Sequence, residues 1–347
     1  MLKKISFPFI LCLCLFLTAC QGAEEPQSTA VTEEKTATIH AMDTVMNLSV
    51  YTEDDSLLEQ ADELVTDLEK HLSTTIDSSE IYTLNQKKYA ELSDDTAYLL
   101  KEALRFCEKT DGTLDLSIYP IVRAWGFTTD SYQIPQQSQL DQLLQNVDYT
   151  KIDYDETKKR VSIPDSMEID LGSVAKGYTG DRLIELFREN DVTSALLNLG
   201  GNVQALGNKP DGSPWKIGIQ DPLGENFIGV LSVTDKAVIT SGGYERYFKG
   251  DDGTIYWHII DPKTGRPAKN GLISTTAIGP KGVYCDGLST SLFIMGPEKA
   301  IAFWKEHRDF DMILITEEKE ILVTPDLADS FELVEGVPYT LKVIENA

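Results

Sequence analysis

Strand patterns and helix patterns alternate irregularly along this chain of 347 residues, and this arrangement restricts the fold more than any other feature. Apolar runs predict strands at 45–51, 194–199, 215–219, 227–234, 255–260, 273–279, 311–316 and 320–324. Apolar residues at helical spacing predict helices at about 57–72, 94–110, 174–189, 286–296 and 297–307. A doubly wound parallel sheet needs a regular strand–helix–strand rhythm, which this order does not have. We therefore expect an α+β fold with mixed or antiparallel sheets and packed helices.

Local signals mark the ends of two of these helices. Ser56 is followed three residues later by Glu59, which predicts a capping box at the start of the first helix. Asp111 and Gly112 predict the end of the second helix, because glycine readily adopts the left-handed conformation that closes a helix.

The chain begins with a segment typical of exported proteins. Lys3 and Lys4 precede an apolar run over 7–19, which is too short for a stable membrane-spanning helix. The run ends in small residues before Cys20, and this pattern resembles a lipoprotein signal. The resemblance implies a signal peptide over 1–19, acylation of Cys20, and a position on the extracytoplasmic face of the bacterial cell membrane. A plain secretory signal with a chance cysteine is the alternative.

A polar segment separates the signal from the folded body. Residues 20–37 contain no aromatic residue, and their composition predicts a disordered tether. Residues 38–347 are then expected to form the folded domain.

The charge of the chain excludes some classes of partner. Loss of residues 1–19 removes two lysines and no acids, leaving 29 basic and 56 acidic residues and a net charge of −27. Such a surface repels nucleic acid and anionic lipid head groups, so membrane attachment depends on the acyl chains. An anionic substrate needs a local positive device, most simply a metal ion.

The cysteines do not form a disulfide framework. Of the five, Cys12 and Cys14 leave with the signal and Cys20 carries lipid, so Cys107 and Cys285 remain. One bridge between them can form in an oxidising compartment, but two separate buried thiols are the preferred interpretation.

The segment over 169–181, IDLGSVAKGYTGD, is typical of a strand that enters a glycine turn and leaves as a helix. The first N–H groups of that helix lack helical partners and can hold an anion. The segment is not a P-loop, because the Gly-x4-Gly-Lys-Ser/Thr spacing is missing. An ordinary strand-to-helix turn is the alternative.

Three further polar segments are rich in glycine. The turn over 110–117 is consistent with a helix end, and Gly200 and Gly201 permit close backbone approach or form a bulge. The third segment leads from SGGYERYF (241–248) to His258, which is either a buried core residue or a proton carrier. Asp261 begins an Asp-Pro-x-x-Gly turn and is expected to be structural.

The segment over 285–290 offers oxygen ligands. If a helix starts here, Asp286 and Thr290 are four residues apart and share one face of its first turn. A carboxylate and a hydroxyl suit a hard cation such as Mg²⁺ and do not suit zinc. The alternative is that Asp286 only caps the helix.

Taken in order, these segments resemble the ApbE family of FAD:protein FMN transferases. The resemblance runs from Met42 to about Gly296 and includes, besides the segments above, Asp77-Ser-Ser-Glu80 with Asn85 and the stretch 111–127. It implies an ApbE-like, T-fold-like body with two intertwined subdomains. The sequence departs from the family where Asp43 replaces a usual glycine, where Thr74 and Thr75 replace an aromatic position, and at Gly243, where many members have Asp.

The resemblance also implies the roles of individual residues. It implies Mg²⁺ ligands at Asp286, at Thr290 and at the backbone carbonyl of Ser173, and proton handling by His258 or Asp286. It implies FAD contacts from the following residues: Met42, Thr113, Leu114, Asp115, Asp170, Lys176, Gly200, Gly201 and Ile260.

The implied activity is Mg²⁺-dependent transfer of the FMN half of FAD to a threonine or serine hydroxyl of a partner protein, with release of AMP. The implied partner is a membrane-bound or extracytoplasmic electron-transfer subunit. An FAD pyrophosphatase, in which water replaces the hydroxyl, is the nearest alternative. A lipid-anchored flavin receptor without catalysis is the alternative from another class.

Overall fold

The computed structural model describes residues 33–129, 131–251 and 253–346, and these belong to one compact unit. The signal, Cys20 and the tether up to residue 32 lie outside the described residues. No helix within the described ranges is long and apolar enough to cross a membrane.

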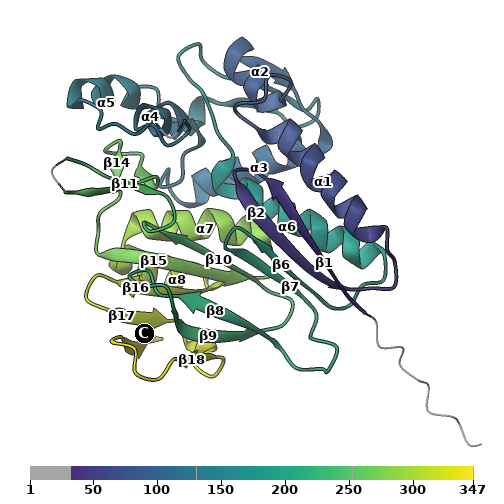
Figure 1. Cartoon of the computed structure of the whole chain (residues 1–347). Helices are drawn as coiled ribbons and strands as arrows, with labels where there is room; N and C mark the ends of the chain where they lie inside the picture. The colour runs from purple at the N-terminus through teal and green to yellow at the C-terminus, as the bar shows by residue number, and fades with distance from the viewer. Residues whose placement is uncertain (1–32, 130, 252, 347) are drawn as a thin grey trace, which may run out of the picture. The chain divides into compact units, whose positions relative to one another are not determined.

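Nine strands form the central sheet (Figure 1). Neighbouring strands pair antiparallel except β17 and β19, which run parallel, so the sheet is mixed as predicted. In spatial order the strands are β1 (Glu34–Ala41), β2 (Thr44–Tyr51), β6 (Ala195–Leu199), β7 (Asn202–Leu206), β10 (Ala237–Gly242), β15 (Leu272–Gly279), β16 (Asp311–Thr316), β17 (Glu320–Val323) and β19 (Thr340–Val343).

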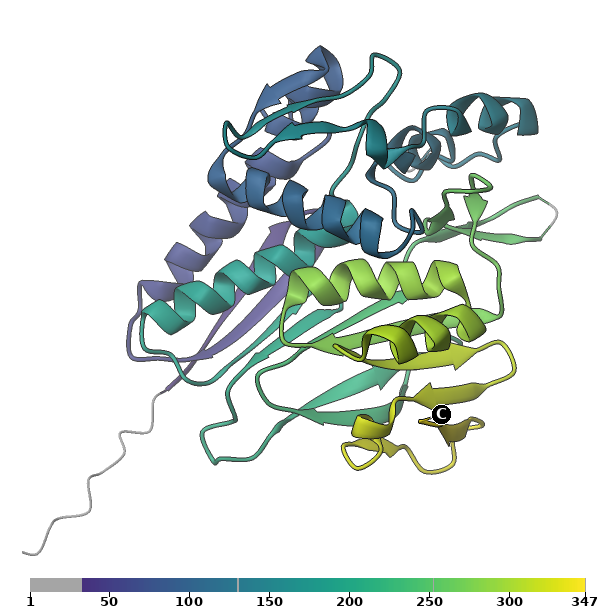
Figure 2. The same cartoon turned by 180° about the vertical axis from the view of Figure 1, so that it is seen from behind.

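Helices cover one face of this sheet, as Figure 2 shows from behind. They are α1 (Leu57–Leu72), α6 (Gly172–Glu189), α7 (Gly282–Met295) and α8 (Pro297–His307). A three-stranded sheet packs on the opposite face, with the order β18 (Phe331–Leu333), β9 (Phe227–Val233) and β8 (Trp215–Gln220). Successive side chains of β16 alternate between the two faces: Met312 and Leu314 join the helical core, whereas Ile313 and Ile315 join the sheet-on-sheet core.

Smaller elements surround one end of the sheet. The helical elements are α2 (Glu80–Lys87), α3 (Asp94–Lys109), α4 (Tyr119–Ala124), α5 (Gln137–Leu144) and the 3₁₀ turns η1 (Leu116–Ile118) and η2 (Tyr149–Lys151). A third 3₁₀ turn, η3 (Pro325–Leu327), follows β17. The short strands are β3 (Tyr89–Glu91), β4 (Asp153–Asp155), β5 (Arg160–Ser162), β11 (Tyr247–Lys249), β12 (Ile255–Trp257), β13 (Ile260–Asp261) and β14 (Arg266–Pro267). Trp125 and Phe127 form a separate apolar cluster with Ile260.

The α+β prediction is confirmed, and so are the helices expected at 57–72, 94–110, 174–189 and 297–307. The strand expected over 255–260 is interrupted, because β12 ends at Trp257 and β13 begins at Ile260. The C-terminal end of the expected tether also shifts: β1 already begins at Glu34, so residues 34–37 pair with β2 and are not disordered.

One predicted helix cap and one predicted helix start are wrong. Ser56 does not form a capping box, because its N–H and hydroxyl both donate to Oδ1 of Asp54 at 2.8 Å. Helix α7 begins at Gly282, four residues before the expected start, because the Asp181 carboxylate of α6 accepts the N–H groups of Gly282 and Val283 at 2.6 and 2.9 Å. A cap supplied from another helix leaves no signal in the local sequence.

Candidate functional site

Two tight turns lie side by side at one end of the central sheet. Met42 and Asp43 connect β1 to β2 with φ of 52° and 56°, and Gly200 and Gly201 connect β6 to β7 with φ of 60° and 93°. Strands β2 and β6 are paired, so a Cβ on Gly200 would lie 2.0 Å from Oγ1 of Thr44. The positive φ of Asp43 is a left-handed conformation, which glycine adopts readily. This conformation explains why glycine is the usual residue at this position.

Met42 is tied to the neighbouring helices. Its N–H donates to Oε1 of Glu69 at 2.6 Å, and its sulfur accepts a weak hydrogen bond from Thr179 at 3.5 Å. A non-glycine residue at positive φ is held there only by such surroundings. The turn is thus a fixed edge of the candidate site.

Helices α6 and α7 meet through glycines. A Cβ on Gly177 would lie 2.3 Å from the carbonyl oxygen of Gly282 and 2.7 Å from Cβ of Asp286. Any side chain at Gly177 would push the two backbones apart. The contact brings Asp286 of α7 against the beginning of α6.

Asp286 is buried, and its Oδ2 accepts the N–H of Gly177 at 2.8 Å. In a regular helix this N–H would donate to the carbonyl of Ser173, four residues earlier. The Asp286 carboxylate and the Ser173 carbonyl oxygen therefore compete for the N–H of Gly177, so both oxygens lie close to that N–H. Asp286 is in the second turn of α7, so the alternative that it only caps the helix is wrong.

Thr290 follows Asp286 by one turn of α7 and is half-buried. Its hydroxyl is 3.3 Å from the hydroxyl of Ser241, which also lies 2.8 Å from the hydroxyl of Ser289. The last residues of β10 thus hold the hydroxyl-bearing face of α7. Asp286 and Thr290 share one face of the helix, as the sequence predicted.

Several acidic side chains lie near the positive charge of Lys176. Loss of solvation raises the pKa of Asp170, Asp286 and Glu245, in the case of Glu245 to about 7, and the charge of Lys176 opposes each rise. Asp43 and Asp286 add like-charge repulsion to Asp170 and Glu245, respectively. One half-buried cation therefore faces an excess of carboxylates contributed by separate elements.

The positive charge of Lys176 also acts on His258. Burial, together with the charges of Lys176 and Arg246, lowers the pKa of His258 to about 4. Its Nδ1 is 3.2 Å from the carbonyl oxygen of Arg246, which can only accept. The neutral imidazole therefore carries its proton on Nδ1 and leaves the Nε2 lone pair free for a reacting group.

The remaining predicted contacts are placed at the margin of the site. The Asp115 carboxylate accepts from Ser117 and from the N–H of Tyr149, and Leu114 is buried in the main core, whereas Thr113 is half-buried. The turn that contains these residues is linked to the site by one hydrogen bond, in which the N–H of Asp170 donates to the carbonyl oxygen of Leu116 at 3.0 Å. The Ile260 side chain is buried in the Trp125 cluster, so only its backbone can face a ligand.

Three residues that were not predicted from the sequence lie at this place: Glu245, Asn202 and Gln204. Glu245 belongs to the segment SGGYERYF, and a Cβ on Gly201 would lie 4.0 Å from its Oε1. Asn202 and Gln204 alternate with Val203 and Ala205, a pattern that usually marks a solvent-facing polar side. Both amides are buried instead.

The described residues contain no group of three His, Cys, Asp or Glu side chains that could hold a metal ion. The donor set expected for Mg²⁺ has a single carboxylate, with a hydroxyl and a backbone carbonyl completing it. A buried carboxylate with one hydrogen-bonded oxygen, beside a carbonyl that competes for the same N–H, fits a hard cation. The Mg²⁺ site stays a prediction.

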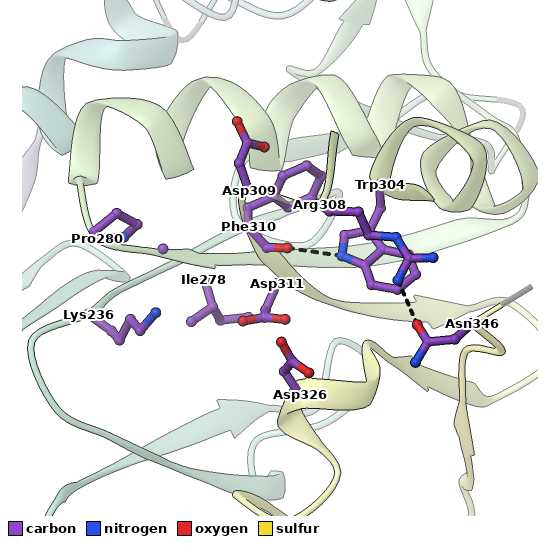
Figure 3. Close-up of a pocket in the computed structure, with 11 residues that line it drawn as sticks. Lys236, Ile278, Pro280, Trp304, Arg308, Asp309, Phe310, Asp311, Asp326 and Asn346 are labelled. Atoms are coloured by element: carbon purple, nitrogen blue, oxygen red, sulfur yellow. Dashed lines mark hydrogen bonds between the residues drawn. The ribbon is translucent and has the colours of Figure 1, made fainter. Parts of the chain in front are cut away.

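A cavity of about 550 Å³ lies elsewhere, at the opposite end of β10 (Figure 3). Lys236, Asp311 and Asp326 line it, and the two carboxylates face each other. Burial and then Asp326 raise the pKa of Asp311. None of the predicted site residues lines this cavity, so it is separate from the candidate site.

Cys107 and Cys285 are both buried and free, as the preferred interpretation expected. Burial raises the pKa of the Cys107 thiol to about 12 and that of the Cys285 thiol well above its usual value. Neither is a reactive thiolate at neutral pH.

A protein-family model described as the ApbE family matches residues 42–314, a range that contains every element of the site. The chain belongs to the ApbE family. An FAD:protein FMN transferase from Haemophilus influenzae is 30% identical over 313 residues, covering 87% of this chain and 90% of that protein.

Solved structures of ApbE proteins share the fold. The crystal structure of the ApbE protein from Thermotoga maritima matches with a TM-score of 0.80 and 29% identity, covering 86% of this chain and 99% of that one. The flavin transferase ApbE from Vibrio cholerae matches with a TM-score of 0.74 and 27% identity, covering 82% and 94% of the two chains. The α+β architecture is therefore that of known flavin transferases.

Proposed function

We propose that this ApbE-family enzyme transfers the FMN half of FAD to a threonine or serine hydroxyl of a partner protein and releases AMP, with Mg²⁺ as the metal. The observation that carries the proposal is the convergence of Lys176, His258 and the Asp286–Thr290 face at one end of the sheet. Relatives that carry the name FAD:protein FMN transferase align along most of the chain.

The metal site of this proposal consists of the Asp286 carboxylate, the Thr290 hydroxyl and the Ser173 carbonyl. When bound, Mg²⁺ neutralises the pyrophosphate and the charge that develops on departing AMP. Lys176 supplies a second positive charge, which the chain needs because its formal net charge is −25. The first N–H groups of α6 face the same region and add donors for phosphate oxygens.

His258 is the proton acceptor in this proposal. Its neutral Nε2 takes the proton of the acceptor hydroxyl as the oxygen attacks the FMN phosphorus in line. A new P–O bond forms, the bond to the AMP phosphate breaks, and AMP leaves with the electron pair. Asp286 keeps its carboxylate for the cation and does not exchange a proton.

The flavin itself lies against the turns at the end of the sheet. Gly200 and Gly201 expose backbone without side chains, and the Met42 turn forms the adjacent edge. We assign the FAD contacts predicted for Asp170, Lys176 and the 113–115 turn to the same pocket. Cys20 carries the lipid that holds the enzyme at the extracytoplasmic membrane surface, where electron-transfer subunits are its acceptors.

Two alternatives differ in what the enzyme does with FAD. A pyrophosphatase would use water and give free FMN and AMP from the same site. A receptor would bind flavin without consuming it, and the Asp286–Thr290 face argues against this because simple binding has little need of a metal.

The deciding experiment incubates the purified protein with FAD and Mg²⁺, with and without chelator, and analyses AMP and FMN. A candidate acceptor domain present in the same reaction is examined by mass spectrometry for a gain of FMN. Chelator-sensitive AMP release with FMN on the acceptor supports transfer, whereas free FMN alone identifies the pyrophosphatase. If AMP is not formed in any sample, only the receptor remains.

A further inference from the structure

Strand β7 presents two buried amides to the helical face of the sheet. Asn202 and Gln204 are 3% and 4% exposed, and they point to the same side because strand side chains alternate. Val203 and Ala205 point to the other side and pack in the sheet-on-sheet core. Two carboxamides in a layer that is otherwise apolar need a specific reason to be there.

Gln204 holds the glycine at which α6 and α7 meet. Its Nε2 donates to the carbonyl of Gly177 at 2.9 Å. A Cβ on Gly180 or Gly282 would lie 2.2 or 1.8 Å from the same nitrogen. The amide therefore occupies a socket that exists only because these positions lack side chains.

Gly177 passes this restraint to Asp286. Its carbonyl is held by Gln204, and its N–H donates to Oδ2 of Asp286 at 2.8 Å. Asp286 cannot rotate away from this N–H without leaving a buried donor unpaired, which is costly. Gln204, Gly177 and Asp286 thus form one connected chain of hydrogen bonds.

Asn202 approaches the same carboxylate from the strand. Its Nδ2 is buried and has no hydrogen-bond partner within the described residues. Strand β7 packs on both α6 and α7, so this unpaired buried donor faces the layer that holds Asp286.

We infer that Asn202 and Gln204 are positioning residues for Asp286: Gln204 acts through Gly177 on Oδ2, and Asn202 restrains the carboxylate directly. The inference rests on the proposed function, because it gives Asp286 the role of a metal ligand. Outer residues that orient a ligand commonly change metal affinity by about 10- to 100-fold. Neither amide contacts substrate in this scheme.

The test measures Mg²⁺ binding by isothermal titration calorimetry with FAD present, for the wild type and for Asn202→Ala, Asn202→Ser and Gln204→Leu. The control is Ser291→Ala, which removes a buried hydroxyl of α7 that donates only to the carbonyl of Gly287, at 2.7 Å. FAD affinity in chelator and the unfolding temperature are measured for every variant.

We expect the Mg²⁺ dissociation constants of Asn202→Ala and Gln204→Leu to rise about 10- to 100-fold. Asn202→Ser, which keeps a donor, should recover part of the loss, and FAD affinity in chelator should stay within about twofold of wild type in all variants. Unchanged Mg²⁺ affinity in both variants, or losses equal to that of Ser291→Ala, would overturn the inference. If the wild type binds no Mg²⁺ with FAD, the proposed metal site itself fails.

Discussion

The N–H of Gly177 donates to Oδ2 of Asp286 at 2.8 Å, although the two residues are 109 positions apart in the chain. The bond joins α6 to α7 and takes a donor that the Ser173 carbonyl would otherwise use alone. The same N–H therefore orients a carboxylate of α7 close to a carbonyl in the first turn of α6. This pairing gives the candidate site its oxygen-rich character.

Replacing Asp286 tests the metal argument directly. We expect Asp286→Ala and Asp286→Asn to lower FAD turnover by at least about 10²-fold, because the only carboxylate of the expected donor set is lost. Stability should not fall in Asp286→Asn, since burial raises the pKa of Asp286 and a neutral amide avoids that cost. AMP release and thermal unfolding check this, with exposed Asp326→Asn as the matched control. Normal turnover in Asp286→Asn would remove the metal argument.

Replacing Gly200 tests the close approach of the two turns. Gly200→Ala introduces a positive-φ side chain whose Cβ would lie 2.0 Å from Thr44 Oγ1, whereas Gly212, also at positive φ, has open space. Gly212→Ala should cost about 1 kcal/mol in free energy of unfolding from strain alone, and Gly200→Ala about 1–3 kcal/mol more. Urea titrations compare the two. Equal losses would mean that the Thr44 contact is not maintained in solution.

Removing the charge of Lys176 tests the electrostatic centre of the site. We expect Lys176→Met to weaken FAD binding by about 10- to 100-fold, as loss of a charged hydrogen bond does. Lys176→Arg should retain most of the affinity. Flavin fluorescence titrations measure the change, and Lys209→Met, whose lysine lies over the Trp215 ring in the loop before β8, controls for net charge. An effect of the same size in Lys209→Met would reduce the role of Lys176 to long-range attraction.

The protonation of His258 has a defined pH window. Its pKa is lowered to about 4 in the folded chain, against an ordinary value of 6.5. The unfolded chain therefore binds the proton more readily between these values, and stability is lost as the pH falls from 6.5 towards 4. The difference in unfolding free energy between wild type and His258→Gln should decrease across this window by up to about 3 kcal/mol.

Nitrogen NMR of the imidazole gives an independent measurement of the same group. His258 should remain neutral from pH 8 to about pH 5, with the proton on Nδ1, because Nδ1 faces the Arg246 carbonyl. A midpoint near the ordinary histidine value, or the opposite tautomer, would contradict the assignment of Nε2 as proton acceptor.

The lipid anchor is tested separately from the chemistry. Cys20→Ser should move the protein from the membrane fraction to the soluble extracytoplasmic fraction and abolish labelling by a palmitate analogue. The purified variant should turn over FAD at the wild-type rate, since Cys20 lies outside the described body. Retention of the variant in the membrane fraction would show that another part of the chain provides attachment.

Much of the fold was predictable because it follows local periodicity. The spacing of Leu57, Ala61, Val65 and Leu68 makes a buried stripe, and α1 follows it. Strands with apolar runs, such as 311–316, were equally clear. Helices α2, α4 and α5 were missed because each is short and has few buried residues.

The site was predictable only in part, because its contacts join distant segments. The shared face of Asp286 and Thr290 follows from helical spacing, but the start of α7 depends on Asp181, about a hundred residues earlier. Asn202 and Gln204 were missed because alternating polar and apolar residues normally indicate a solvent-facing side. Burial of polar side chains against another helix cannot be inferred from one strand.

The meeting of α6 and α7 through bare backbone also has a consequence for how the protein matures. A growing chain that ends before residue 282 contains Ser173, Lys176 and His258 but lacks the second helix of the crossing. Until α7 docks on Gly177, no fragment holds the carboxylate and the lysine together. Under the proposed function, flavin transfer therefore begins only after this late assembly step, and a truncated copy without α7 is inactive.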